Sequence, residues 1–231
     1  MPLDTTAGPE HPYFDLVVAR APAAAKQWLL ARREGLGPDG FPVVYAGAGR
    51  RLGASLVEPT AEESARLVAA GLIVPRGWPL SAVGRVALLA QVCQGLDREA
   101  RVQLARGVFK TGDNDERAAL LKSLSMLPEP EAFVELAIDA CRSHVQQVFE
   151  AIACENPYPA RHFPEHAFNQ MVLKSFFTNT AVQRIEGLSA RRSAELVRMA
   201  EAYASERRAA GRAVPGDLPL VTGALPKNAP N

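Results

Sequence analysis

The chain has 231 residues, 48% of them hydrophobic, which is enough for one large domain or two small ones. Its 26 basic and 25 acidic side chains nearly cancel, so the composition gives no sign of a nucleic-acid footprint or a polybasic membrane patch. Three cysteines, an odd number and far apart, argue against a disulfide framework. The N-terminus lacks the charged start and apolar core of a signal peptide, and no run reaches the ~20 apolar residues of a membrane span. We therefore expect a soluble, cytoplasmic protein.

The first elements predicted are a helix and a connector. Residues 1–12 carry Gly and Pro without periodicity and predict a flexible N-terminus. Helical patterning then predicts a helix over residues 14–36. Residues 35–59 are rich in helix breakers and predict a Gly/Pro-rich connector, because the glycines of 47–53 lack the spacing of a dinucleotide-binding loop. The strand-like run at 43–45 is too short and isolated to build a sheet.

From Thr60 onward the sequence is helical. Thr60 and Glu63 form a capping-box pattern at the start of one helix, and Asp97 is placed to cap a later one. Asp113 or Asp115 is placed to cap the helix after that, which explains this acidic run more simply than a cation loop does. The remaining helices are predicted at 79–95, 98–108, 116–127, 131–142, 144–153, 164–177 and 190–210.

Helix pairs joined by short Pro-containing turns recur about every 30 to 40 residues, as in stacked α-hairpins. The predicted fold is therefore all-α, an irregular HEAT-like array of stacked antiparallel helix pairs. Residues 13–210 are expected to form a single α-helical domain. The Pro/Gly-rich stretch 211–231 is expected to be a disordered tail.

The stretch 154–174 stands out from the Leu/Ala/Val helices around it. Pro157, Pro159 and Pro164 each remove a backbone donor and bias the preceding residue toward extended geometry, which predicts a stiff loop before a helix. Such a loop is a suitable wall for a binding groove. The candidate ligand-binding residues on it are Glu155, Asn156, Tyr158, Arg161, His162, His166, Asn169, Gln170 and Lys174.

The helix predicted at 164–177 has a mixed face. At 100° per residue, Leu173 and Phe177 fall inside the arc that holds the polar residues. A freely solvated face would not normally hold both, so His166, Asn169 and Gln170 are expected to face a partly buried surface. That surface is either a pocket wall or a polar network that ties the helix to its neighbours.

Catalytic and metal sites are weaker alternatives on the same stretch. Cys154, His162 and His166 are too few and too interrupted, with Pro164 between the histidines, for a zinc site, so we expect neither a metal nor a cofactor. Cys154 at the end of an apolar stripe is more typical of a buried hydrophobe than of a nucleophile paired with His162. No catalytic residue is predicted. The alternative function is an enzyme acting on a small polar metabolite, with His162 or His166 as acid/base and Arg161 as anion clamp.

The run Glu155-Asn156-Pro157-Tyr158-Pro159-Ala160-Arg161-His162-Phe163-Pro164, followed by Asn169-Gln170-Met171-Val172-Leu173-Lys174, resembles the signature segment of the EboA family. The preceding residues 111–128 are also similar to the EboA family. Residues 78–89 show a looser similarity to it. The resemblance covers residues 28–198.

This resemblance implies a place in metabolite traffic. EboA-type proteins are encoded beside a UbiA-like prenyltransferase, a dehydroquinate-synthase-like cyclase and metal-dependent hydrolase-like proteins, and the family has no established catalytic residues to carry over. We therefore predict a non-catalytic metabolite-binding or scaffold protein that acts through 155–174. Its expected partners are a small metabolite, other proteins of the pathway (prenyltransferase or cyclase-like), or both.

Overall fold

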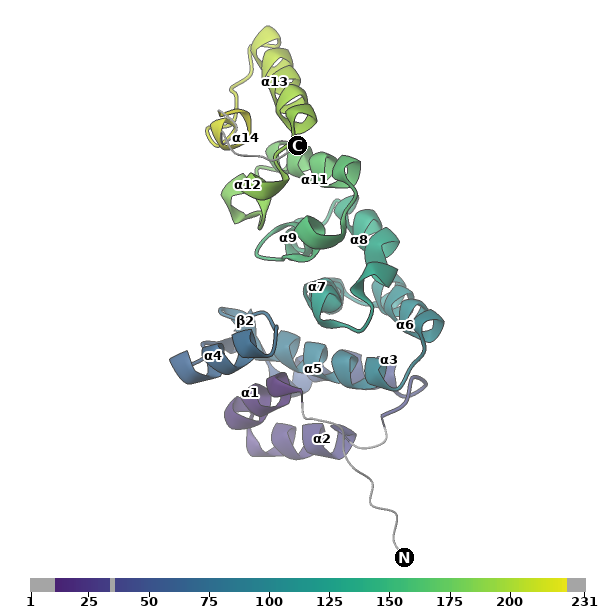
Figure 1. The fold of residues 1–231 in the computed structure, drawn as a ribbon. Helices are drawn as coiled ribbons and strands as arrows, with labels where there is room; N and C mark the ends of the chain where they lie inside the picture. Colours follow the sequence, from purple (N-terminus) through teal and green to yellow (C-terminus); the bar gives the residue numbers. More distant parts are fainter. Residues whose placement is uncertain (1–10, 34–35, 224–231) are drawn as a thin grey trace, which may run out of the picture. The chain divides into compact units, whose positions relative to one another are not determined.

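The computed structural model describes residues 11–33 and 36–223, and these are almost entirely helical. They contain fourteen α-helices, three 3₁₀ turns and one two-stranded sheet (Figure 1). The all-α prediction is therefore confirmed, while the HEAT-like stacking stays a prediction. Contacts divide the chain into two compact units, residues 1–132 and 133–231, and each is described by itself.

The first unit is built around α5, whose side chains are apolar on nearly every side and are buried along most of its length. Helices α1, α3 and α7 pack against it, as an all-round apolar helix requires. A two-residue antiparallel pairing joins β1 to β2 just before α5 begins. The elements are α1 Pro12–Arg20, α2 Ala23–Arg33, α3 Phe41–Leu52, β1 Leu56–Val57, α4 Ala61–Ala69, β2 Trp78–Pro79, α5 Leu80–Gln94, α6 Arg98–Thr111 and α7 Asn114–Ser123.

Two sequence predictions in this unit are wrong. The helix expected over 14–36 is two helices, because Pro22 cannot continue the first one and begins the turn between them. The connector expected over 35–59 contains α3, which also takes up the strand-like run at 43–45. Burial of its apolar stripe against α5 outweighs the low helix propensity of its glycines; the stripe consists of Phe41, Tyr45, Ala48 and Leu52.

The caps predicted at Thr60 and Asp97 are confirmed, and of the two candidates Asp113 and Asp115 the structure has Asp113, so that α7 begins two residues before the predicted start at 116. Thr60 Oγ1 accepts from Glu63 N at 3.2 Å, while Glu63 Oε2 accepts from Thr60 N at 2.8 Å. Asp97 caps α6 by accepting from Ala100 N. Asp113 caps α7 in a second capping box, with Glu116 as its partner. These caps depend on residues only three positions apart, which is why the sequence alone identifies them.

Glu63 also links α4 to α1, and this predicts a pH-dependent loss of stability. Its two carboxylate oxygens accept from Arg20 at 3.0 and 2.6 Å, and this pairing is the main cause that lowers the Glu63 pKa to about 2. A folded-state pKa below the unfolded value of 4.5 adds stability above that value, and the addition is lost as pH falls from 4.5 toward 2. Glu63→Gln should therefore cost about 1 kcal/mol at neutral pH and progressively less in acid.

Urea unfolding at pH 7, 5 and 3 checks this, followed by tryptophan fluorescence, because Trp28 and Trp78 both lie in the first unit. Glu62→Gln is the matched control, since Glu62 is an exposed neighbour on the same turn. Equal stability of Glu63→Gln and Glu62→Gln at pH 7 would contradict the prediction.

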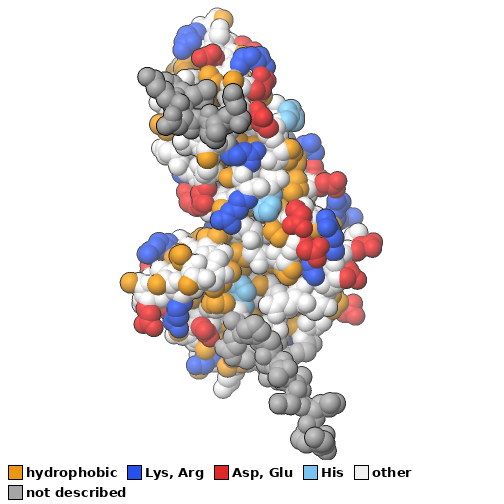
Figure 2. Space-filling model, in the orientation of Figure 1, with side chains coloured by type: hydrophobic (Ala, Val, Ile, Leu, Met, Phe, Trp, Pro, Cys, Tyr) orange, Lys and Arg blue, Asp and Glu red, His pale blue; other side chains and the backbone are white. Residues whose placement is uncertain are grey.

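The second unit packs its helices around a core rich in aromatic side chains, including Phe149, Tyr158 and Phe168. Helix α8 packs on α9, and α11 contacts α13. Acidic and basic side chains lie interspersed on the face drawn in Figure 2. The helices are α8 Val134–Cys141, α9 Gln146–Ala153, α10 Tyr158–His162, α11 Glu165–Phe177, α12 Leu188–Arg191, α13 Ala194–Ala209 and α14 Pro219–Thr222.

The expected disordered ends need correction where the structure describes them. Residues 211–223 carry α14, which packs on α13 with Leu218 and Val221 buried, so the prediction of a disordered tail is wrong for this part. At the other end, α1 already begins at Pro12. Residues 1–10 and 224–231 lie outside the described residues. Among the described helices, none combines the length and apolar character that crossing a bilayer requires.

Candidate functional site

Segment 155–174 belongs to the second unit and consists of a turn, a short helix, a second turn and α11. The loop expected before Pro164 is partly helical, because α10 forms over Tyr158–His162. Pro157 is its N-cap residue and Pro159 lies in its first turn, where a missing backbone donor costs nothing. The three prolines therefore shape the helix ends and do not keep the whole stretch extended.

Asn156 and Tyr158 fix the start of α10 from within the core. The side chain of Asn156 is 1% exposed, donates from Nδ2 to Ala151 O at 2.9 Å and accepts at Oδ1 from Tyr158 N at 3.0 Å. The Tyr158 ring is fully buried and lies 4.8 Å from the half-buried ring of His162. These contacts give Asn156 and Tyr158 structural roles that a short polar side chain in a turn commonly takes.

Glu155 is held by an arginine far along the chain. Arg184 donates from Nε and Nη2 to the two Glu155 carboxylate oxygens at 2.8 and 3.0 Å, and from Nη1 to Glu150 Oε2 at 2.7 Å. The Arg184 carbonyl accepts from Glu155 N at 2.9 Å. Glu155 itself has a left-handed backbone, with φ of 46°. This bidentate pairing pins the turn that leads into α10.

Lys174 ties α11 to the end of α8. Its Nζ donates to Cys141 O and to Ser143 O, both at 2.6 Å, and lies 4.7 Å from the Phe149 ring centroid. Burial lowers the pKa of Lys174. Because the ammonium satisfies two carbonyls at a helix C-terminus, Lys174 belongs to the polar network of the fold.

The polar residues on the mixed face of α11 differ in burial. Asn169 is 1% exposed, and its Oδ1 has no hydrogen-bond partner among the described residues. His166 and Gln170 are exposed, so the expectation of a partly buried surface is correct for Asn169 and wrong for these two. Phe177, which the helical wheel placed on the polar arc, is 70% exposed.

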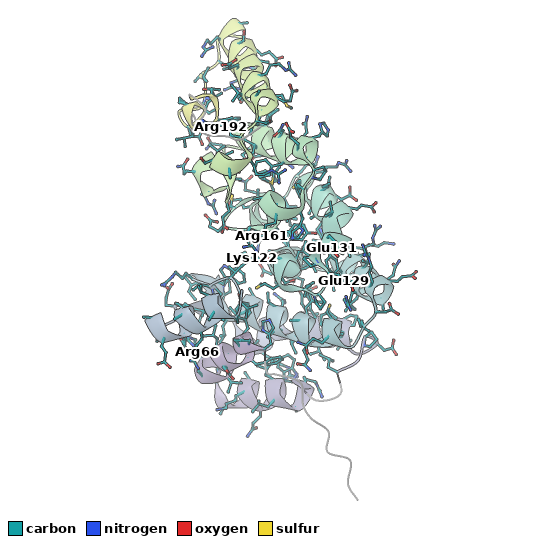
Figure 3. All side chains as sticks on the ribbon, in the orientation of Figure 1. Arg66, Lys122, Glu129, Glu131, Arg161 and Arg192 are labelled. Carbon is teal, nitrogen blue, oxygen red and sulfur yellow. The ribbon has the colours of Figure 1, made fainter. Side chains whose placement is uncertain are left out.

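Arg161 projects from the last turn of α10, at the end of this unit away from α13 (Figure 3). It is exposed, and its charge opposes the rise that burial causes in the Glu186 pKa. Within the described part of the chain, the side chains of Arg161, His166 and Gln170 form no hydrogen bond. Of the nine predicted site residues, these three are the ones left open to a partner.

The residue that holds the carbonyl end of α10 is Arg191, which sequence reasoning missed. Its guanidinium donates to Ala160 O, at longer range to Pro159 O, and to Phe163 O at 2.8 Å. It also stacks over the Phe168 ring, 4.7 Å from the centroid. An arginine in a basic stretch gives no local sign of such contacts, since the three carbonyls that it binds lie 28 to 32 residues earlier.

The thiol of Cys154 is buried, and burial raises its pKa to about 11. A thiol with that pKa is protonated at neutral pH and is a poor nucleophile. Among the residues that the structure describes, no three His, Cys, Asp or Glu side chains are grouped to hold a metal ion.

A second feature lies in the first unit, where sequence analysis predicted a connector. A surface cavity of about 770 Å³ opens between α3, the start of α5 and the start of α7. Its polar lining comes from Arg50, Ser81, Arg85, Asp113 and Asp115. The Gly-rich run at 47–53 and the acidic run at 113–116 are each visible in the sequence, but nothing local in the sequence shows that the fold brings them to one cavity.

One protein family, described as Metabolite traffic protein EboA, matches residues 23–222. The chain belongs to the EboA family. The match contains the whole segment 155–174 and extends past both ends of the resemblance predicted over 28–198. Comparison with curated proteins finds no match, and comparison with solved structures finds none. The family description places EboA proteins in metabolite traffic.

Proposed function

We propose that this EboA protein binds a component of its pathway without transforming it, through the exposed side of segment 155–174. The observation that carries the proposal is a contrast within the segment. Its backbone and buried side chains are fixed by Asn156, Arg184 and Arg191, whereas Arg161, His166 and Gln170 are exposed and use none of their hydrogen-bonding capacity within the described residues. A rigid frame that presents free polar groups loses little entropy on binding.

The exposed groups define what the surface recognises. The Arg161 guanidinium offers a planar fork that matches a carboxylate or phosphate. His166 and Gln170 each supply donors and acceptors one helical turn apart. This set suits an acidic group of a metabolite, or an acidic patch on another protein of the pathway, such as the cyclase-like or prenyltransferase-like enzyme.

The alternative hypothesis, that this segment is catalytic, has less support. The thiol of Cys154 is buried and protonated, and the ring of His162 packs against Tyr158. His166 is exposed to solvent, so water is not excluded from its ring.

The test compares two double variants in the second unit. The site variant Arg161→Ala/His166→Ala removes two exposed groups of the segment. The control variant Arg208→Ala/His144→Ala removes the same residue types from exposed positions outside it. Native mass spectrometry measures retention of a small molecule, and the pathway product is quantified in cells that carry each variant.

The site variant should lose the retained molecule or the pathway product, while the control keeps both. Stability should change by less than about 0.5 kcal/mol in either, because all four positions are at the surface. A site variant that keeps both would rule the segment out as the binding surface.

A further inference from the structure

We propose that the cavity between α3, α5 and α7 in the first unit binds a small hydroxylated acid, held at its carboxylate or phosphate by Arg85 and Arg50. The volume of about 770 Å³ is within the range of small-molecule sites, roughly 300 to 1,000 Å³. This site is separate from segment 155–174, so the proposal does not rest on the proposed function.

Arg85 is the central residue because it is a buried cation that faces a cavity. Its side chain is 3% exposed and lies on α5, the core helix of the unit. Nε donates to Tyr45 O at 3.2 Å, and Cζ lies 5.7 Å from the Tyr45 ring centroid. A buried guanidinium has five N–H donors, and buried donors are nearly always satisfied.

The nearby carboxylate of Glu116 does not accept a hydrogen bond from the remaining N–H groups of Arg85. Glu116 Oε1 lies 3.7 Å from Arg85 Nη2, which offsets charge but exceeds hydrogen-bond distance. Glu116 is engaged elsewhere, since its Oε2 accepts from Asp113 N in the α7 capping box. Among the described residues, the two Nη groups of Arg85 therefore make no hydrogen bond. Neither Nη group belongs to the fully enclosed atoms that lack a partner, and Arg85 lines the cavity, so a ligand there can reach both groups.

The cavity wall beside the guanidinium contains Gly49, which has no side chain. A Cβ at Gly49 would lie 2.7 Å from Arg85 Nη2, so a larger residue there would displace the guanidinium. Gly47 and Gly53 also line the cavity and leave α3 backbone accessible from it. Arg50 lies beside Gly49 on the same rim and brings a second cation to the cavity. Two arginines with exposed backbone between them form a surface complementary to an anionic group.

The rim of the cavity on the α7 side is acidic, and this restricts the kind of ligand that can bind. Asp113 and Asp115 line the cavity at the start of α7. Asp113 Oδ1 accepts from Glu116 N at 2.8 Å, but a carboxylate has about four acceptor positions and this cap uses one. Carboxylates repel a second anion and accept from hydroxyl groups. The ligand therefore carries one acidic end for Arg85 and Arg50 and hydroxyl groups for the Asp113–Asp115 rim, and Ser81 also lines the cavity.

Calorimetric titration of the full chain tests the proposal with three probes. Gluconate presents a carboxylate with hydroxyls, glucose 6-phosphate presents a phosphate with hydroxyls, and glucose presents hydroxyls alone. We expect millimolar or tighter binding of at least one acid and none of glucose. Binding of gluconate alone identifies a carboxylate site, and binding of glucose 6-phosphate alone identifies a phosphate site.

Neighbouring arginines on α3 give the matched variants. Arg50 lines the cavity, whereas Arg51 places its guanidinium 5.1 Å from the Trp28 ring centroid. Arg50→Met should weaken the bound acid about tenfold, as expected for loss of one charge-assisted contact, and Arg51→Met should leave it unchanged. Arg85→Met should abolish binding; if that variant does not fold, the pair Arg50→Met and Arg51→Met decides.

Three outcomes would overturn the proposal: no binding of either acid, binding of glucose as tight as the acids, or equal effects of Arg50→Met and Arg51→Met. The variant Arg161→Ala/His166→Ala should bind the acid like the unaltered chain. That readout separates a failure of the cavity from a failure of segment 155–174.

Discussion

Replacing Arg191 by alanine is expected to destabilise the second unit by about 3 kcal/mol. The guanidinium donates to Ala160 O and Phe163 O and stacks on Phe168. Hydrogen bonds from a charged group contribute about 1.5 to 3 kcal/mol each, and a cation–π contact about 1 kcal/mol. These contributions overlap because one side chain makes them, and Arg191 is partly exposed, so the sum falls well short of full additivity.

Hydrogen exchange is the suitable measurement, since both tryptophans lie in the other unit. The backbone amides of Arg161 and Phe163 donate the hydrogen bonds that close the turn of α10. In Arg191→Ala, these two amides should show the largest increase in exchange rate over the unaltered chain.

Two variants serve as controls for Arg191→Ala. Arg198→Ala removes an exposed pair with Glu195 on α13 and should leave stability almost unchanged, because solvent screens that pair. Arg191→Lys keeps the charge but cannot bridge both carbonyls, so it should recover only part of the loss. Full recovery by lysine would show that charge alone, and not the planar fork, holds α10.

The parts of this fold that could be predicted from sequence are those set by neighbours in the chain. The caps at Thr60, Asp97 and Asp113 place their partners three residues away, so two helix starts lie where the pattern puts them and the third lies at the first of its two candidate caps. Helix α3 could not be predicted in this way. Its glycines and prolines are poor helix formers, and the helix is stable because Phe41 and Tyr45 are buried against the rest of the unit.

The candidate site shows the same division. The segment itself stands out in the sequence, because three prolines lie among polar residues. The roles of its side chains could not be predicted, because their partners are distant in the sequence. Lys174 binds the carbonyls of Cys141 and Ser143, and Glu155 pairs with Arg184. The cavity was the least predictable feature, since Tyr45 and Glu116, whose contact brings its two rims together, are 71 positions apart.

Gly187→Ala is the second change expected to have a large effect, at about 3 kcal/mol. Gly187 has φ of 71°, a left-handed conformation that costs an alanine roughly 1 to 2 kcal/mol. A Cβ there would also lie 2.5 Å from the Cβ of Ala160 in α10, and such overpacking adds about 1 to 3 kcal/mol. The close approach of these two backbones is what positions the helix that carries Arg161.

Gly211→Ala separates the two causes, because Gly211 has φ of 64° and would place its Cβ against nothing within 4 Å. It should cost only the backbone part, about 1 kcal/mol. The variant Ala160→Gly/Gly187→Ala removes the clash and leaves the backbone strain, so it should be more stable than the sum of the two single changes by about 1 to 2 kcal/mol. Additive effects in that cycle would mean that strain in the turn before α12, and not contact with α10, is the reason for glycine at this position.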